Sequence, residues 1–273
     1  MPDFADFRTR AAVFAGACVL LVCAVLGAAL WSPPCNIDLA DLDDQAARAA
    51  QMAAARIDGH FEMLENLLRD LSRAISINPD DITANDALLR GVKSGLPDSI
   101  ANIFVLTPDG TNIGNAVGQH AAAGDRDYFL KVMAGAPLAV GVPIRSRSNL
   151  GWVIPVARPI KDESGAIRAV LAVATFVSGL RDLTGARELP IGSIVQILDQ
   201  GGSEVTSVPS DPGPGEIDLL RLEQAVRLYR AADSREFDRK GMAATGVASI
   251  RRAPWLVGVA LPMETAIILT ASF

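Results

Sequence analysis

Arg126 and Tyr128 lie in one short segment and carry side chains that could bind a small molecule. The segment reads Gly124-Asp125-Arg126-Asp127-Tyr128-Phe129. An arginine offers a planar fork of N–H donors that matches a carboxylate, and a tyrosine adds a ring and a hydroxyl group. A surface ion pair of Arg126 with Asp125 or Asp127 is at least as well supported by the sequence, so both interpretations stay open.

Arg158 is the second candidate, because of its expected place in a strand. Alternate residues of a strand share a face, so Arg158 should lie on the same side as Trp152, Ile154 and Val156. A buried and unpaired guanidinium would be costly. Arg158 should therefore reach solvent, pair with a carboxylate such as Asp127 or Asp162, or bind an anionic ligand. Trp152 joins the candidate set, although tryptophan more often packs in a core. We expect Arg145 and Arg147, in the loop before Gly151, to be solvated, with a place at the rim of the site as the alternative.

The residue pattern gives little support for an enzymatic activity. The only histidines are His60 and His120, and they form no metal-ligand spacing. The sequence contains no phosphate-binding loop of the Walker type and no Gly-x-Ser-x-Gly nucleophile elbow. We expect a protein that is not an enzyme and has neither a metal nor a cofactor.

The N-terminal region predicts a membrane anchor. Residues 11–31 contain no charged residue, and 21 helical residues span roughly 31 Å, about the thickness of a bilayer core. Arg8 and Arg10 precede this segment and acidic residues follow it, so residues 1–10 should form a cytoplasmic tail and the remainder should lie outside a bacterial inner membrane. A signal peptide cleaved near Gly27-Ala28-Ala29 is the alternative.

The net charge of −6 does not support nucleic-acid binding.

A long helix should follow the anchor, over about residues 38–77. Its apolar positions recur at steps of three or four, as one helix face requires: Leu42, Ala46, Ala49, Ala53, Ile57, Phe61, Leu64, Leu68, Leu71 and Ile75. The helix could pack on its own domain, serve as a stalk that pairs with a second copy, or do both.

The rest of the chain predicts an α+β fold with antiparallel sheets. Two apolar runs, Ile103–Leu106 and Ile194–Leu198, are each followed by an Asp- and Gly-containing turn, which is typical of a β-hairpin. The two units form a weak internal repeat. Further strands are expected at residues 138–144, 151–158, 166–176, 243–251 and 255–261, and helices at 127–134 and 217–232, with a loop at 209–214.

The order of these segments resembles the double Cache sensors of bacterial receptors. Asp125-Arg126-Asp127-Tyr128-Phe129 is similar to a segment of many such sensors, and Trp152–Ile160 followed by Asp162 and Gly165 is similar to their strand-turn-strand. Ala169 departs from the glycine often found in the family. The resemblance implies a stalk helix at 36–78, a membrane-distal PAS-like lobe at 79–185, a membrane-proximal PAS-like lobe at 186–265, and the start of a second membrane helix at 266–273.

The resemblance also implies a function and a site. The chain would be the sensor region of a histidine kinase, diguanylate cyclase or chemoreceptor without its output module, and a homodimer formed through the long helix. Its distal lobe would bind a small molecule, with a carboxylate as a candidate group, through Arg126, Asp127, Tyr128, Trp152 and Arg158. An anchored envelope interaction protein without a ligand is the alternative, and an exported hydrolase is a weaker one.

Overall fold

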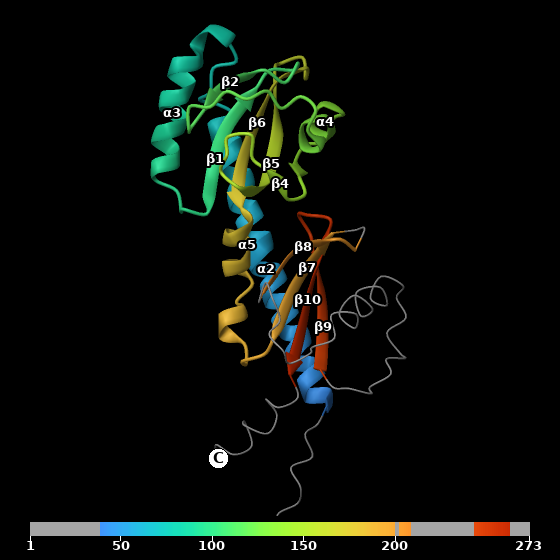
Figure 1. The fold of residues 1–273 in the computed structure, drawn as a ribbon. Helices are drawn as coiled ribbons and strands as arrows, with labels where there is room; N and C mark the ends of the chain where they lie inside the picture. The colour runs from blue at the N-terminus through green and yellow to red at the C-terminus, as the bar shows by residue number, and fades with distance from the viewer. Residues whose placement is uncertain (1–38, 200–201, 209–242, 263–273) are drawn as a thin grey trace, which may run out of the picture. The chain divides into compact units, whose positions relative to one another are not determined.

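The computed structural model describes residues 39–199, 202–208 and 243–262 (Figure 1). The order of elements begins with α2 (Leu39–Leu71), a short 3₁₀ turn (Pro79–Asp81) and α3 (Ile82–Ser94). No helix in the described ranges is long and apolar enough to cross a bilayer. The segments predicted as membrane helices, 11–31 and 266–273, lie outside the described residues.

Helix α2 confirms the long helix predicted from the apolar period. Its predicted face is buried along its whole length, from Leu42 to Leu71. The helix ends six residues earlier than expected, because the backbone of Ser76 finds new partners. Its N–H donates to Asn85 Oδ1 at 3.0 Å and its carbonyl accepts from Asn85 Nδ2 at 2.9 Å. These side-chain bonds replace helical ones and turn the chain toward α3.

A six-stranded antiparallel sheet follows α3 in the chain. Its strands are β1 (Ile100–Leu106), β2 (Asn112–Asn115), β3 (Ala139–Val140), β4 (Ile144–Arg145), β5 (Trp152–Lys161) and β6 (Ile167–Phe176), in the order β2-β1-β6-β5-β3 with β4 also paired to β5. The hairpins β1–β2 and β5–β6 confirm two predicted turns. Helix α4 (Asp127–Met133) was also predicted and packs against β5, β3 and β6.

One predicted strand, 138–144, is wrong as a single element. The structure has two short strands, β3 and β4, separated by Gly141-Val142-Pro143. Pro143 has no N–H to donate to a ladder. Gly141 lies so close to Pro155 that an added Cβ would come within 2.8 Å of the proline ring, and its N–H donates to the carbonyl of Pro155 at 2.8 Å.

The second sheet has four antiparallel strands. They are β7 (Ile194–Asp199), β8 (Glu204–Val208), β9 (Ala243–Ile250) and β10 (Trp255–Pro262), in the order β8-β7-β10-β9. The hairpin β7–β8 confirms the second half of the predicted repeat. Helix α5 (Val177–Leu183) and a 3₁₀ turn (Ala186–Glu188) connect the two sheets and were not predicted. The predicted helix 217–232 and the loop 209–214 lie outside the described residues.

Helix α2 packs against both sheets, on β5 and β6 of the first and on β9 and β10 of the second (Figure 1). Its alanine-rich half meets β9, whose inward residues are small and buried: Ala244, Gly246 and Ala248. Further along, the Phe61 ring stands edge-on to Trp255 with the centroids 5.6 Å apart. The buried carboxylate of Asp58 accepts the N–H groups of Arg251 and Arg252, at 3.2 and 2.9 Å.

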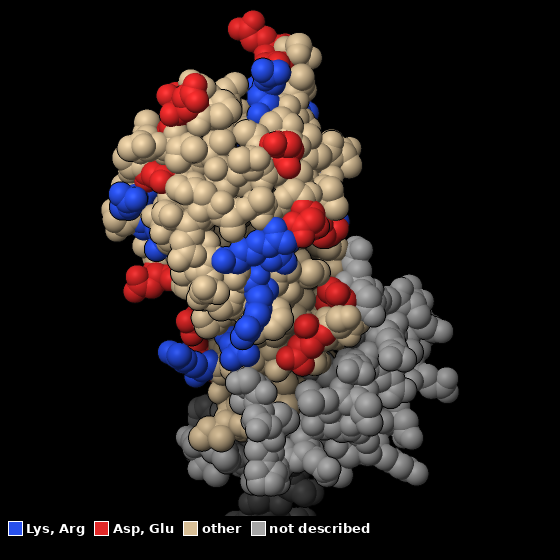
Figure 2. Space-filling view, turned by 45° about the horizontal axis from the view of Figure 1, so that its top comes forward, with Lys and Arg blue, Asp and Glu red and all other residues tan. Residues whose placement is uncertain are grey.

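The described surface carries charges of both signs close together. On the face shown in Figure 2, Lys and Arg side chains lie beside Asp and Glu side chains, with uncharged surface between them. The ion pairs of the described residues include Arg69–Glu65 and Lys131–Asp127, both one helical turn apart. Exposed pairs of this kind contribute little to stability.

Candidate functional site

A pocket lies between α4 and one face of the six-stranded sheet. We call it the Tyr128 pocket. Its volume is about 50 Å³. Its walls come from β1, β2, β5, β6, α4 and two loops: Asn102, Phe104, Asn112, Asn115, Gln119, Ala121, Ala123, Arg126, Tyr128, Ser146, Arg147, Ser148, Val153, Pro155 and Ala174.

Two glycines allow the segment before α4 to approach the sheet closely. Gly110, in the turn between β1 and β2, has φ +86°, a conformation that side chains rarely tolerate. A Cβ on Gly110 would come within 2.3 Å of Gly124 Cα. The N–H of Ala123 donates to the carbonyl of Gly110 at 3.0 Å. This contact fixes the start of α4, and therefore Arg126 and Tyr128, against the β1–β2 hairpin.

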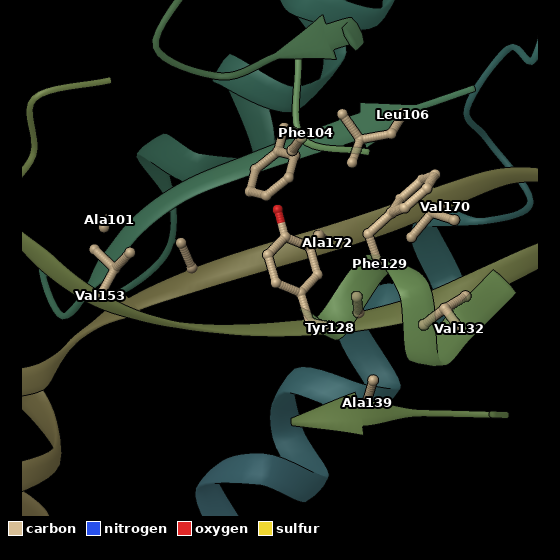
Figure 3. Close-up of a cluster of buried hydrophobic side chains, with 13 residues drawn as sticks. Ala101, Phe104, Leu106, Tyr128, Phe129, Val132, Ala139, Val153, Val170 and Ala172 are labelled. Carbon is tan, nitrogen blue, oxygen red and sulfur yellow. The ribbon is translucent and has the colours of Figure 1, made fainter. Parts of the chain in front are cut away.

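Tyr128 lies in a hydrophobic cluster that forms one end of the pocket (Figure 3). The side chain is 4% exposed, and its ring stands edge-on to Phe104 with centroids 6.4 Å apart. Its hydroxyl points toward Phe104 in Figure 3. Burial raises the pKa of Tyr128 to about 12, so the hydroxyl is a neutral hydrogen-bond donor at neutral pH.

Arg126 is half-buried at the pocket wall, and most of its N–H donors make no hydrogen bond with a described residue. Its Nη2 donates to the carbonyl of Arg145 at 3.3 Å. Neither of the two carboxylates considered from the sequence pairs with it. Asp125 is bound by Arg147, and Asp127 is bound by Lys131 at 2.7 Å.

Arg147 links the loop after β4 to the segment before α4. Its two terminal nitrogens donate to the Asp125 carboxylate at 2.8 and 2.6 Å, and Nη1 also donates to the carbonyl of Ala122. The hydrogen bonds from Arg147 lower the pKa of Asp125 below its usual value. Arg147 is exposed, as expected, and it also lines the pocket, which was the alternative, with its charge balanced by Asp125.

Two buried asparagines turn amide donors toward the pocket. Asn102 Oδ1 accepts the N–H of Ile103 at 2.9 Å, and Asn112 Oδ1 accepts the N–H of Gly114 at 3.1 Å. A backbone N–H can be accepted only by the amide oxygen, which fixes the orientation of each amide. The side chains are 4% and 5% exposed. Their Nδ2 groups form no hydrogen bond with a described residue, so they remain available to an occupant.

The five residues predicted for the site divide into two groups. Arg126 and Tyr128 line the Tyr128 pocket. Asp127 lies on the exposed side of α4, paired with Lys131, and Trp152 is 56% exposed at the start of β5. Neither of them, nor Arg158, lines this pocket.

Arg158 lies on the opposite face of β5, toward α2. Its Nε and Nη1 atoms are buried and make no hydrogen bond with a described residue. Desolvation lowers its pKa, and the neighbouring charge of Arg69 on α2 lowers it further. Strand alternation explains this placement, because Val153 and Pro155 face the pocket and even-numbered neighbours face α2.

Asn102 and Asn112 were missed as site residues. Asn102 left a signal, since it is the single polar residue in the strand Ile-Ala-Asn-Ile-Phe-Val-Leu and lies two positions before Phe104. A polar residue within a fully buried strand needs a partner. Asn112 left no comparable signal, because it follows turn-forming residues, where polar side chains are common.

Similarity to solved structures places the chain in a fold class. The extracellular domain of rpHK1S-Z16, a candidate histidine kinase, matches with a TM-score of 0.65 and 19% identity over 85% of this chain and 99% of that one. The ligand-binding domain of the Pseudomonas fluorescens chemoreceptor CtaA, in complex with L-isoleucine, matches with a TM-score of 0.59 and 13% identity over 84% and 95%. That of the Pseudomonas aeruginosa amino acid chemoreceptor PctC, in complex with GABA, matches with a TM-score of 0.57 and 14% identity over 81% and 100%.

These similarities concern the fold. The chain has the α+β fold of extracellular ligand-binding domains of histidine kinases and chemoreceptors, which confirms the α+β fold that the resemblance implied. No protein-family model and no curated protein sequence matches the chain.

Proposed function

We propose that this chain is the extracytoplasmic sensor region of a membrane-bound bacterial signalling receptor and binds a small molecule in the Tyr128 pocket. The receptor would be of the histidine kinase, diguanylate cyclase or chemoreceptor type. The fold is shared with sensory domains whose structures contain isoleucine or GABA. Fold alone does not fix function, so the proposal depends on the pocket.

The observation that best supports the proposal is that the charge of Arg126 is unpaired at the pocket wall. A half-buried guanidinium faces a pocket beside a buried tyrosine hydroxyl and has no carboxylate partner among the described residues. A partly desolvated cation is stabilised by an anion that completes its hydrogen bonds. A ligand carboxylate fits this position, and isoleucine and GABA both carry that group.

The proposal includes a membrane setting and two lobes. Residues 11–31 would be the anchor, 1–10 a cytoplasmic tail, and 266–273 the start of a second membrane helix. Residues 36–78 would form the stalk helix through which two copies pair. The six-stranded sheet would belong to a membrane-distal PAS-like lobe, 79–185, and the four-stranded sheet to a membrane-proximal PAS-like lobe, 186–265.

Strand β5 offers a direct route from the pocket to the long helix. Val153 and Pro155 line the pocket, while Ile154 and Val156 are fully buried on the other face of the same strand, which packs on α2. A ligand that favours one position of β5 would therefore bias α2. Such a signal requires different ligand affinities in the two states.

The experiment is a thermal-shift screen of the full chain against small acids, amino acids and amines, followed by calorimetry. A ligand should raise the melting temperature, because binding to the native state alone stabilises it. Arg126→Ala should abolish the shift. Arg168→Ala is the matched control, since Arg168 is an exposed arginine of β6 whose ion-pair distance to Asp162 is 3.9 Å. If no compound stabilises the chain, or if both variants keep the shift, the proposed site is wrong.

A further inference from the structure

We infer that the Tyr128 pocket selects short carboxylic acids that lack an amino group and rejects the corresponding amino acids. The inference rests on the proposed function and narrows its ligand class. It differs from what the similar chemoreceptor domains contain, which are an amino acid and GABA.

Three side chains of the pocket wall offer hydrogen-bond donors that no described carboxylate occupies: Asn102, Asn112 and Arg126. The amide oxygens of Asn102 and Asn112 are both occupied by backbone N–H groups, at 2.9 and 3.1 Å. Both residues line the pocket, and their Nδ2 groups are left as donors, together with the guanidinium of Arg126. Carboxylate oxygens accept such bonds, and an ammonium group, which only donates, does not.

Among the described residues, no acidic side chain lines the pocket to receive an ammonium group. Two acids lie behind the wall residues and are already bound: Asp125 gives both carboxylate oxygens to Arg147, and Asp86 accepts from Asn115 N and pairs with His120. Asn115 cannot replace them, because its Oδ1 accepts from Val117 N at 2.9 Å and its Nδ2 donates to the Gln119 carbonyl at 2.6 Å. An amino group in this pocket would lose its hydration beside Arg126 without gaining a negative partner.

The size of the pocket limits the length of the acid. A volume of about 50 Å³ holds only a few water molecules, so the pocket suits an acid with few carbon atoms. Propionate, lactate and butyrate are acids of this size.

The test uses pairs of compounds that differ only by the amino group. Isothermal titration of the full chain compares butyrate with 4-aminobutyrate, and propionate with alanine. We expect each acid to bind and each amino compound to bind at least about tenfold more weakly. If an amino compound binds as tightly as its partner, the inference fails while the sensor proposal stands. If neither class binds, both fail.

Asn102→Asp is a second test, in which the preference for acids over amino compounds should reverse. The substitution keeps an oxygen for the N–H of Ile103 but replaces the free amide donor with a carboxylate oxygen. We expect it to weaken binding of the acids and to strengthen binding of the amino compounds. Asn112→Asp should act in the same direction, which guards against a folding defect in one variant. Asn66→Asp, an equivalent change on an exposed site of α2, should leave both affinities unchanged. Wild-type preferences in both pocket variants would overturn the inference.

Discussion

Arg126 and Arg158 are both partly buried arginines without an ion pair to a described carboxylate, but their surroundings differ. Arg126 faces a pocket that an anion can enter. Arg158 faces α2, where desolvation lowers its pKa, Arg69 and Arg73 lower it further and Glu65 raises it. The proposed ligand would complete the first arrangement, whereas Glu65, the carboxylate near the second, is already bound by Arg69 and Arg252. Burial of an arginine is therefore informative only together with the space and charges beside it.

Arg158→Met should leave the free energy of unfolding unchanged or raise it by up to about 1 kcal/mol, because an unpaired cation is replaced by an apolar side chain of similar length. Urea denaturation followed by circular dichroism measures this. Arg252→Met is the matched control, since Arg252 donates to Glu65 at 2.5 Å and pairs with Glu62 at 3.1 Å. The control should lose about 1 kcal/mol. A larger loss for Arg158→Met than for Arg252→Met would show that Arg158 has a stabilising partner.

At the scale of elements, α2 and β9 approach each other through small residues. The alanine-rich half of α2 was interpreted from the sequence as suited to close helix contact, including contact with a second copy. In the structure this half packs on the small inward face of β9. A Cβ on Gly246 would come within 2.2 Å of the α2 backbone at Ala46 and Ala47. Backbone atoms cannot move aside as a flexible side chain can, so this contact fixes the spacing of helix and sheet.

Gly246→Ala should therefore lower the free energy of unfolding by about 1–3 kcal/mol, the usual cost of overpacking a core. Thermal and urea denaturation of the variant check this value. Gly91→Ala is the matched control in α3, where an added Cβ would meet nothing within 4 Å. It should raise the free energy of unfolding by about 0.4–1 kcal/mol, because alanine suits a helix interior better. Equal effects of both substitutions would contradict the close contact between α2 and β9.

At the scale of the whole described unit, one helix joins two sheets. Residues of α2 are buried against the six-stranded sheet and the four-stranded sheet alike. Neither sheet can lose α2 without exposing apolar surface, and burial of that surface is the main stabilising term. The two sheets should therefore unfold together rather than as independent domains.

The variant that combines Trp31→Phe and Trp152→Phe retains Trp255 as its one tryptophan, and Trp255 is buried against Phe61 beside the four-stranded sheet. Urea unfolding of this variant should give the same midpoint by Trp255 fluorescence and by far-ultraviolet circular dichroism, as a two-state transition requires. Trp152 is largely exposed, so its replacement should not alter the core. A second step seen only by circular dichroism would mean that the sheets unfold separately.

Local patterns were sufficient for most elements. The apolar period predicted α2, and the turn residues predicted the hairpins β1–β2, β5–β6 and β7–β8. Helix α3 was missed. It is short, and its buried residues include Asn85, whose amide bonds to Ser76 and Ile113. A polar residue at a core position interrupts the apolar period from which a helix is predicted. Its burial is possible only because of hydrogen-bond partners that are distant in sequence.

The residues of the candidate site could be predicted only in part from the sequence. Arg126 and Tyr128 were identified because they share one segment, but Asn102, Asn112 and Arg147 join them only when β1, β2 and the loop after β4 meet α4. Alternation along β5 correctly separated Arg158 from Val153 and Pro155, because successive side chains of any strand point to opposite faces. Which face holds the pocket and which holds α2 was decided only by tertiary packing, because both faces of a central strand in this sheet are buried and apolar.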